Sequence, residues 1–436
     1  MTERAVNSEG SSPRRRQLTP SQPADHAPPS LLDAATRTAM AQVAVMCWFL
    51  YSLGPIVLLI RDDLQLSRAE AGLHSSLVLL GGLTSGLLSP VVVRRFGRHN
   101  TRRLGLCALA EGCAVMATGD VVWVTLAGAY LCGLGITVAV SAVNASIVEH
   151  HGHASGSALS LLNAVGATLG ICAPLVFTAA LSSGATWHDI LLMTGTAAVL
   201  TIFAARRRFP SDAHAQEVMT ESSNTAATDP AAPLPRTTSG HGVEFRFLLF
   251  ALTAAMLVEF STNIYAIDLI CVNGHLTVAA AATYAAAFIA GFAAGRWTAI
   301  PLALRTAPLT LGLWAAGISA AAAASLVIVH SPVLIAIALF TLGIGTGPGY
   351  PILASAALAA TTSDRDKASA LIAVVGGGGA AVAPFVLGMV ADGFGISAVF
   401  AGLSGIATLS TGVLLYAMFY NRQHGGWVPK QRNLGV

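Results

Sequence analysis

Three carboxylic acids lie inside long apolar stretches of this sequence: Glu111, Glu259 and Asp268. An ionisable side chain in such a segment is energetically costly, so each of the three requires an explanation. Surroundings of low dielectric constant favour the neutral acid, and a carboxyl group held there can take up and release a proton. We therefore expect proton exchange at these positions, above all at Glu259, which lies near the middle of its stretch.

Each acid also has an alternative explanation. Glu259 could make a structural hydrogen bond instead of exchanging protons. Asp268 follows nine residues later, near the end of the same stretch, where we expect a solvated residue at a gate or rim. Glu111 lies in another stretch, and a structural role is the stronger expectation there.

Other motifs exclude several kinds of chemistry. The run His-His-Gly-His at 150–153 has no second ligand cluster in the sequence, so we expect no metal site. The four glycines at 376–379 are not followed by Gly-Lys-Ser/Thr, and no zinc-protease or serine-hydrolase motif occurs. We therefore expect no cofactor, no ATP hydrolysis and no enzymatic activity.

The composition indicates a protein in a lipid bilayer. Hydrophobic residues make up 54% of the 436 residues and charged residues only 10%. A soluble domain carries about 25% charged residues, so this chain cannot cover a water-facing surface of that size. The net charge of +3 gives no reason to expect a nucleic-acid partner.

Twelve apolar stretches are long enough to be membrane helices, since a hydrocarbon core of about 30 Å needs about 20 residues. They are too long for the strands of a membrane barrel. The fold class is therefore an all-α membrane protein. The expected spans are 39–60, 71–93, 104–119, 121–148, 154–182, 187–205, 247–272, 277–299, 307–329, 332–360, 367–391 and 396–420.

The positive charges predict the orientation. With both termini in the cytoplasm, only Arg61 and Arg68 of the 24 lysines and arginines lie outside, and the other 22 lie inside. Because the cations are almost all arginine and Ala and Gly are abundant, we expect a bacterial inner membrane. The chain then divides into a disordered tail (1–36), a six-helix half (37–205), a cytoplasmic linker (206–246), a second half (247–420) and a tail (421–436).

The two halves resemble each other at a constant offset of 210 residues. Gly81 corresponds to Gly291 and Gly133 to Gly343. The same offset relates Gly135 to Gly345, Gly166 to Gly376 and Pro174 to Pro384. Parallel six-helix repeats are typical of transporters that bind substrate between the halves.

This layout and several local patterns resemble the major facilitator superfamily from about residue 37 to 420. The segment RRFGRHNTRR (94–103) is similar to the family's basic loop after the second helix, with matches at Arg95, Gly97 and Arg98. It departs from that pattern at Pro90 and Arg94, which replace a Gly and an Asp. LAGAYLCGLG (126–135) is similar to the fourth-helix pattern.

Two further segments resemble particular branches of the family. GATLGICAP (166–174) resembles the fifth-helix antiporter motif, with its Gly-Pro pair separated. LVEFSTNIYAIDL (257–269) and IAGFAAGRW (289–297) resemble the sugar-symporter branch, in which Glu259 and Arg296 would have counterparts. The sequence therefore leaves export and import open.

The resemblance implies a secondary carrier that works by alternating access, with helices 1, 4, 7 and 10 around the cavity. We expect proton-coupled export of a small apolar compound such as an antibiotic, and we expect the transporter to be a monomer. The alternatives are a proton-coupled importer of a sugar or small metabolite and a membrane sensor. The expected gating residues are Arg95, Gly97, Arg98 and Arg296. The candidate substrate-binding residues are Trp48, Tyr51, Tyr130, Asn144, Asn263, Tyr265 and Tyr350.

Overall fold

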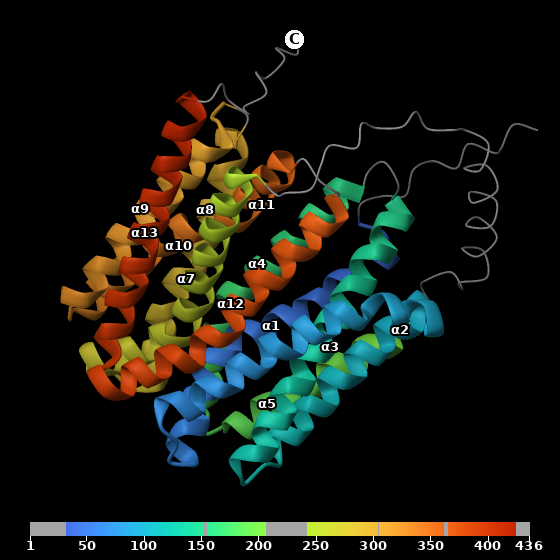
Figure 1. The fold of residues 1–436 in the computed structure, drawn as a ribbon. Helices are drawn as coiled ribbons and strands as arrows, with labels where there is room; N and C mark the ends of the chain where they lie inside the picture. Colours follow the sequence, from blue (N-terminus) through green and yellow to red (C-terminus); the bar gives the residue numbers. More distant parts are fainter. Residues whose placement is uncertain (1–31, 152–154, 206–241, 304, 362–364, 424–436) are drawn as a thin grey trace, which may run out of the picture.

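The protein is a bundle of long helices in the computed structural model, which describes residues 32–151, 155–205, 242–303, 305–361 and 365–423 (Figure 1). Within these ranges the chain forms helices and no strands. The helices are α1 (Ala34–Asp63), α2 (Arg68–Ala117), α3 (Val122–His151), α4 (Ser155–Ser182), α5 (Trp187–Ala205), α7 (Val243–Asn273), α8 (Val278–Ala303), α9 (Pro308–Ile328), α10 (Pro332–Thr346), α11 (Gly349–Ala360), α12 (Arg365–Phe394) and α13 (Ile396–Gln423). The tail 1–31 and the linker residues 206–241 lie outside the described residues.

The expected membrane helices are present, with two differences in how they are divided. By length and composition, 11 of the described segments can cross a membrane. The predicted spans 71–93 and 104–119 join in α2, where Gly97 breaks the helix with φ 73° and ψ 160°. The part of α2 after this break, which ends at Ala117, corresponds to the predicted span 104–119 and is not among the 11 segments.

The predicted span 332–360 is also interrupted. It consists of α10 and α11, which meet at Gly347 and Pro348. Pro348 has no backbone N–H to donate, so a continuous helix would lose a hydrogen bond there. The carbonyl oxygen of Gly347 also has no helical partner, because the N–H four residues later would belong to Pro351, and it is available to a neighbouring helix.

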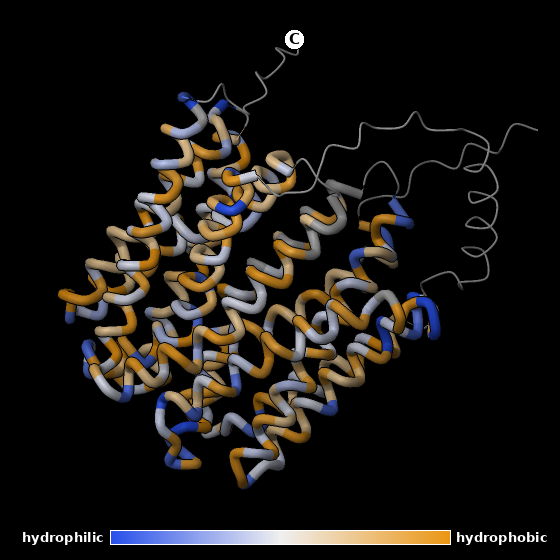
Figure 2. The backbone as a smooth tube through the Cα atoms, in the orientation of Figure 1, coloured by the Kyte–Doolittle hydropathy of each residue, from blue (hydrophilic) through white to orange (hydrophobic). Residues whose placement is uncertain are grey.

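The surface of the bundle is that of a membrane protein. Figure 2 shows apolar residues along most of the length of the helices and hydrophilic residues gathered at their ends. Large apolar side chains are exposed, including Trp123 (75%) and Ile328 (75%). Exposed apolar surface of this extent is stable against lipid rather than water. The chain is a multi-pass membrane protein.

Asp33 fixes the beginning of α1. Its carboxylate accepts a hydrogen bond from the backbone N–H of Thr36, and its second oxygen pairs with His150 at the end of α3. Desolvation tends to raise the pKa of Asp33, but the hydrogen bonds from Thr36 and His150 outweigh it and lower the pKa to about 2. A charged carboxylate at a helix N-terminus is favourable because of the helix dipole.

The 210-residue repeat is visible in the packing of the helices. A Cβ atom on Gly81 would meet the carbonyl oxygen of Tyr130, and one on Gly291 would meet that of Phe340. In the same way, Gly133 lies against Val78 and Gly343 against Phe288. Each of these two contacts in the first half therefore has its counterpart 210 residues later, so α2 packs on α3 as α8 packs on α10.

We expect Gly343→Ala to destabilise the protein, because its Cβ would overlap the backbone of Phe288. Overpacking of this kind costs about 1–3 kcal/mol. The matched control is Gly402→Ala, where nothing lies within 4 Å of the added Cβ. Thermal unfolding in detergent should show a lower Tm for Gly343→Ala and an unchanged or higher Tm for Gly402→Ala. Equal Tm values would contradict the close packing of α8 on α10.

Candidate functional site

A cavity of about 160 Å³ lies between the two halves of the bundle. Residues of α1 and α2 line one side of it, and residues of α7 and α8 line the other. Most of the lining side chains are apolar or aromatic. They are Cys47, Leu50, Tyr51, Leu53, Ser75, Val78, Leu79, Glu259, Phe260, Asn263, Ile264, Phe288, Ile289 and Phe292.

Glu259 is the only charged residue among the described residues that line this cavity. It belongs to α7, the first helix of the second half, which packs against α1 of the first half. A carboxylate in such apolar surroundings is stable only if it is paired or neutralised by a proton. The acid singled out in the sequence therefore lies on the wall of the central cavity.

Arg296 gives Glu259 a cationic neighbour. The guanidinium group of Arg296 is close enough to act electrostatically on Glu259, Tyr51 and Cys47. It lies 4.4 Å from the ring centroid of Phe292, and its Nε donates to the carbonyl oxygen of Gly347 at 3.2 Å. Arg296 is therefore held at the break between α10 and α11, beside the cavity.

Tyr51 and Asn263 are the two other predicted binding residues that line the cavity. The amide nitrogen of Asn263 donates to the carbonyl oxygen of Leu50 at 3.3 Å, which links α7 to α1. The ring of Tyr51 packs where a Cβ on Gly170 would lie. Tyr51 and Asn263, with Ser75 and Glu259, are the polar members of a lining that consists mostly of apolar side chains.

The remaining predicted binding residues lie outside the cavity. Trp48 donates from its indole nitrogen to Thr194 on α5 at 3.1 Å. Tyr265 is buried and donates to the carbonyl oxygen of Pro384. Tyr350 is 38% exposed, and Asn144 is also exposed.

The fourth and tenth membrane helices were expected to line the cavity, but none of the residues that line it belongs to them. Tyr130 on α3 contacts Gly81, so α3 packs against α2. The break after α10 places Tyr350 at the start of α11. The positions on the cavity wall are taken instead by Ser75, Val78 and Leu79 of α2 and by the phenylalanines of α8.

Glu111 and Asp268 lie in different surroundings from Glu259. Glu111 is exposed on the part of α2 after Gly97 and does not line the cavity. Asp268 is buried rather than solvated, with 6% of its side chain exposed. A buried carboxylate of this kind requires partners.

Two arginines hold Asp268. Its Oδ1 lies 3.2 Å from Nη1 of Arg61, and its Oδ2 lies 2.7 Å from Nε of Arg68. Asp392 on α12 accepts hydrogen bonds from the backbone N–H groups of Arg68 and Ala69 at 2.8 and 2.9 Å. These contacts join the first half to the second at one end of the bundle, and we call Arg61, Arg68, Asp268 and Asp392 the Arg61 cluster.

The basic segment 94–103 lies at the opposite end from the Arg61 cluster. Gly97 forms the break in α2, and Arg98 forms an ion pair with Glu149 of α3 at 2.6 Å. Arg95 is exposed, with its guanidinium 5.8 Å from the ring of Phe96. Arg98 therefore connects helices within one half rather than across the two halves.

Sequence reasoning missed Ser75 and the Arg61 cluster. The Ser75 hydroxyl is buried and has no hydrogen-bond partner among the described residues, and Ser75 is one of the residues that line the cavity. A single serine gives no signal in a sequence. Arg61 and Asp268 lie 207 positions apart, and no local pattern indicates their contact.

The fold and the site together describe a multi-pass membrane protein with two repeated halves and a central cavity. A sequence model of the Major Facilitator Superfamily matches residues 39–270. The chain therefore belongs to the major facilitator superfamily and is a transporter rather than an enzyme. No curated protein sequence matches it.

Several solved transporter structures share this fold. The nucleoside transporter NupG has 12% identity and a TM-score of 0.69, with 89% of this chain and 99% of that chain covered. A D-xylose-proton symporter has 14% identity and a TM-score of 0.70, with 92% and 99% covered. A mutant of the peptide transporter POT has 14% identity and a TM-score of 0.70, with 88% and 94% covered. At these identities the likeness concerns the fold alone.

Proposed function

We propose that this transporter exports a small, largely apolar compound, such as an antibiotic, in exchange for protons. The observation that supports the proposal is the composition of the cavity wall. Aliphatic and aromatic side chains make up most of it, and Glu259 is its only charged residue among those described. A wall of this kind binds apolar compounds by the hydrophobic effect and orients them through a few polar groups.

Proton coupling is proposed to act through Glu259. The empty cavity could change its orientation once Glu259 is protonated and neutral, and the substrate-loaded cavity could do so with the carboxylate charged and stabilised by Arg296. Proton binding and substrate binding would then compete for one cavity, which is the requirement for an antiporter.

The orientation and setting are part of the same proposal. The distribution of positive charges supports a bacterial inner membrane with the two termini and the linker in the cytoplasm and the Arg61 cluster on the outer side. The contacts of that cluster then correspond to a state closed to the outside. The partners are the substrate, protons and the lipid of the inner membrane, and the transporter acts as a monomer.

A proton-coupled importer of a sugar or small metabolite is the second candidate. Arg296 acts electrostatically on Glu259 at the cavity, the pair of residues in which the sequence resembles sugar symporters. The same fold occurs in a D-xylose-proton symporter. An importer would place this acid and base beside the hydroxyl groups of a polar substrate.

Transport assays in a sensitive bacterium distinguish the two candidates. We expect expression of the protein to lower the cellular accumulation of at least one compound in a broad panel of apolar antibiotics, and a protonophore to restore it. The control is Glu259→Gln expressed to the same level in the membrane. If expression lowers the accumulation of no antibiotic and labelled sugars accumulate in the cells instead, the protein is an importer.

A further inference from the structure

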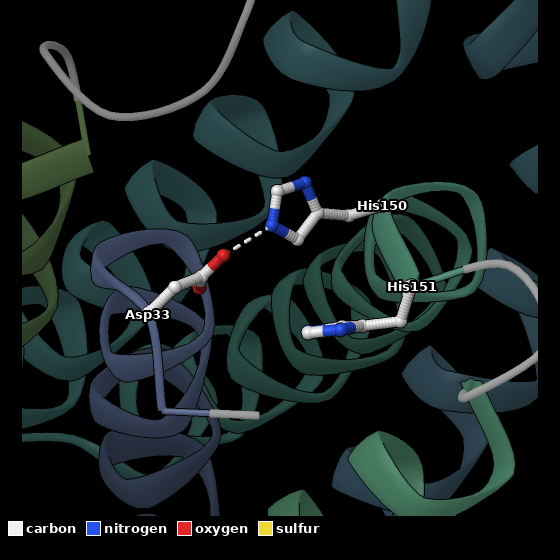
Figure 3. Close-up of side chains that lie close together, drawn as sticks. All are labelled: Asp33, His150 and His151. Carbon is white, nitrogen blue, oxygen red and sulfur yellow. Dashed lines mark hydrogen bonds and ion pairs between the residues drawn. The ribbon is translucent and has the colours of Figure 1, made fainter. Parts of the chain in front are cut away.

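Two histidines and one aspartate come together at the end of the bundle opposite the Arg61 cluster. His150 and His151 end α3, and Asp33 precedes the first turn of α1 (Figure 3). Each side chain offers one ligand atom, and the three atoms lie within 4.8 Å of one another. The sequence showed no second ligand beside the His-His-Gly-His run. The fold supplies one, because it brings Asp33 next to residues more than a hundred positions away.

His151 has a buried nitrogen that the protein itself does not satisfy. Its side chain is 6% exposed, and its Nε2 lies 2.7 Å from Oγ1 of Thr36. Its Nδ1 is buried and has no hydrogen-bond partner among the described residues. A buried ring nitrogen without a partner is costly, and a ligand that accepts its lone pair would remove that cost.

The other two side chains remain accessible from solvent. The side chains of His150 and Asp33 are 27% and 23% exposed, and the carboxylate of Asp33 faces Nε2 of His150. The two imidazole rings are perpendicular, with centroids 4.9 Å apart. Figure 3 shows both rings beside Asp33.

We propose that Asp33, His150 and His151 form a binding site for Zn²⁺ or a similar late first-row divalent ion. Two neutral imidazoles and one carboxylate suit such ions, whereas Mg²⁺ and Ca²⁺ prefer oxygen ligands only. Zinc–ligand bonds of about 2.0–2.2 Å require ligand atoms somewhat closer than 4.8 Å, which small side-chain rotations achieve. Water completes the coordination on the exposed side.

Binding at this site would fix the start of α1 to the end of α3. Both helices belong to the first half, so the ion would strengthen that half without joining it to the second. The site is also separate from the central cavity, where none of the three residues contributes to the wall. The proposal is therefore independent of the direction and substrate of transport.

Zinc titration of the full-length protein tests the proposal. The protein is purified with an affinity tag that contains no histidine, treated with a chelator and titrated with Zn²⁺ against a competing indicator. We expect about one equivalent of tightly bound Zn²⁺ and a higher Tm in its presence. The double variant His150→Ala/His151→Ala should lose both effects, and His330→Ala, which changes an exposed histidine outside the cluster, should keep them.

Asp33→Asn provides a second variant that retains the structure. Asparagine still caps a helix, so α1 should keep its N-terminal hydrogen bond. We expect the affinity for Zn²⁺ to fall at least about tenfold, with little change in Tm in the presence of chelator. If the wild-type protein binds no more Zn²⁺ than the double variant, or if Asp33→Asn binds it equally well, these residues form only an ion pair and a hydrogen bond.

Discussion

Glu259→Gln is expected to abolish transport driven by a proton gradient while leaving substrate exchange intact. Glutamine has nearly the size of the protonated acid, so the cavity and its apolar wall should be preserved. It cannot release a proton, so the imposed gradient has no group through which to act. In reconstituted vesicles, gradient-driven flux should fall to the level of empty vesicles, while exchange of labelled for unlabelled substrate continues.

Glu111→Gln is the matched control, because Glu111 is exposed and lies outside the cavity. We expect it to support both driven transport and exchange. Full driven transport by Glu259→Gln would remove Glu259 as the coupling residue. Loss of driven transport in Glu111→Gln alone would move the coupling site to α2.

Asp268→Asn should open the bundle at the end that carries Arg61. The substitution removes the charge that holds Arg61 and Arg68 at 3.2 and 2.7 Å. Removal of one member of a fully buried pair costs about 3–5 kcal/mol, and these partly exposed arginines reduce the effect. A loss of only about 1.4 kcal/mol would change the ratio of closed to open molecules tenfold.

Labelling of Cys47 measures this opening, because Cys47 lines the central cavity. With the other accessible cysteines replaced, a membrane-impermeant thiol reagent applied from the outside should modify Cys47 at least about tenfold faster in Asp268→Asn. Asp62→Asn is the control, since Asp62 pairs with Arg61 within the first half. Equal labelling of wild-type protein and Asp268→Asn would show that the Arg61 cluster does not keep the cavity closed.

Much of the fold could be predicted from the sequence, because membrane helices follow from the length of apolar stretches. The repeat was predicted from matched glycines, and the structure shows Gly133 against Val78 and Gly343 against Phe288. The breaks were harder to predict. Gly97 and Pro348 are both residues that interrupt helices, but hydrophobicity alone does not show which of many glycines and prolines takes that role.

The cavity was predicted only in part. Glu259, Tyr51 and Asn263 line it, as expected from polar residues in apolar helices. Tyr130 and Tyr350 do not, because the side of a helix that faces a cavity depends on its packing against other helices. The apolar phenylalanines of α8 form much of the wall, and in the sequence they cannot be distinguished from residues that face lipid.

Contacts between distant residues gave no signal at all. From the sequence, Arg61 was expected on the outer side and Asp268 was expected to be solvated. In the fold, Asp268 is buried and pairs with two arginines. Asp33 likewise lay in a tail that was expected to be disordered, and the structure pairs it with His150. The local pattern of a sequence carries no record of such pairs.

Transport by reconstituted vesicles under opposite pH gradients tests the central claim most directly. The substrate is a labelled form of an antibiotic whose cellular accumulation falls when the protein is expressed. Its uptake is followed with the vesicle interior either more acidic or more alkaline than the exterior. The proposed antiport predicts that uptake is driven when the interior is more acidic, because protons leave as substrate enters. Uptake driven only by an alkaline interior, or by neither gradient, would contradict proton-coupled export.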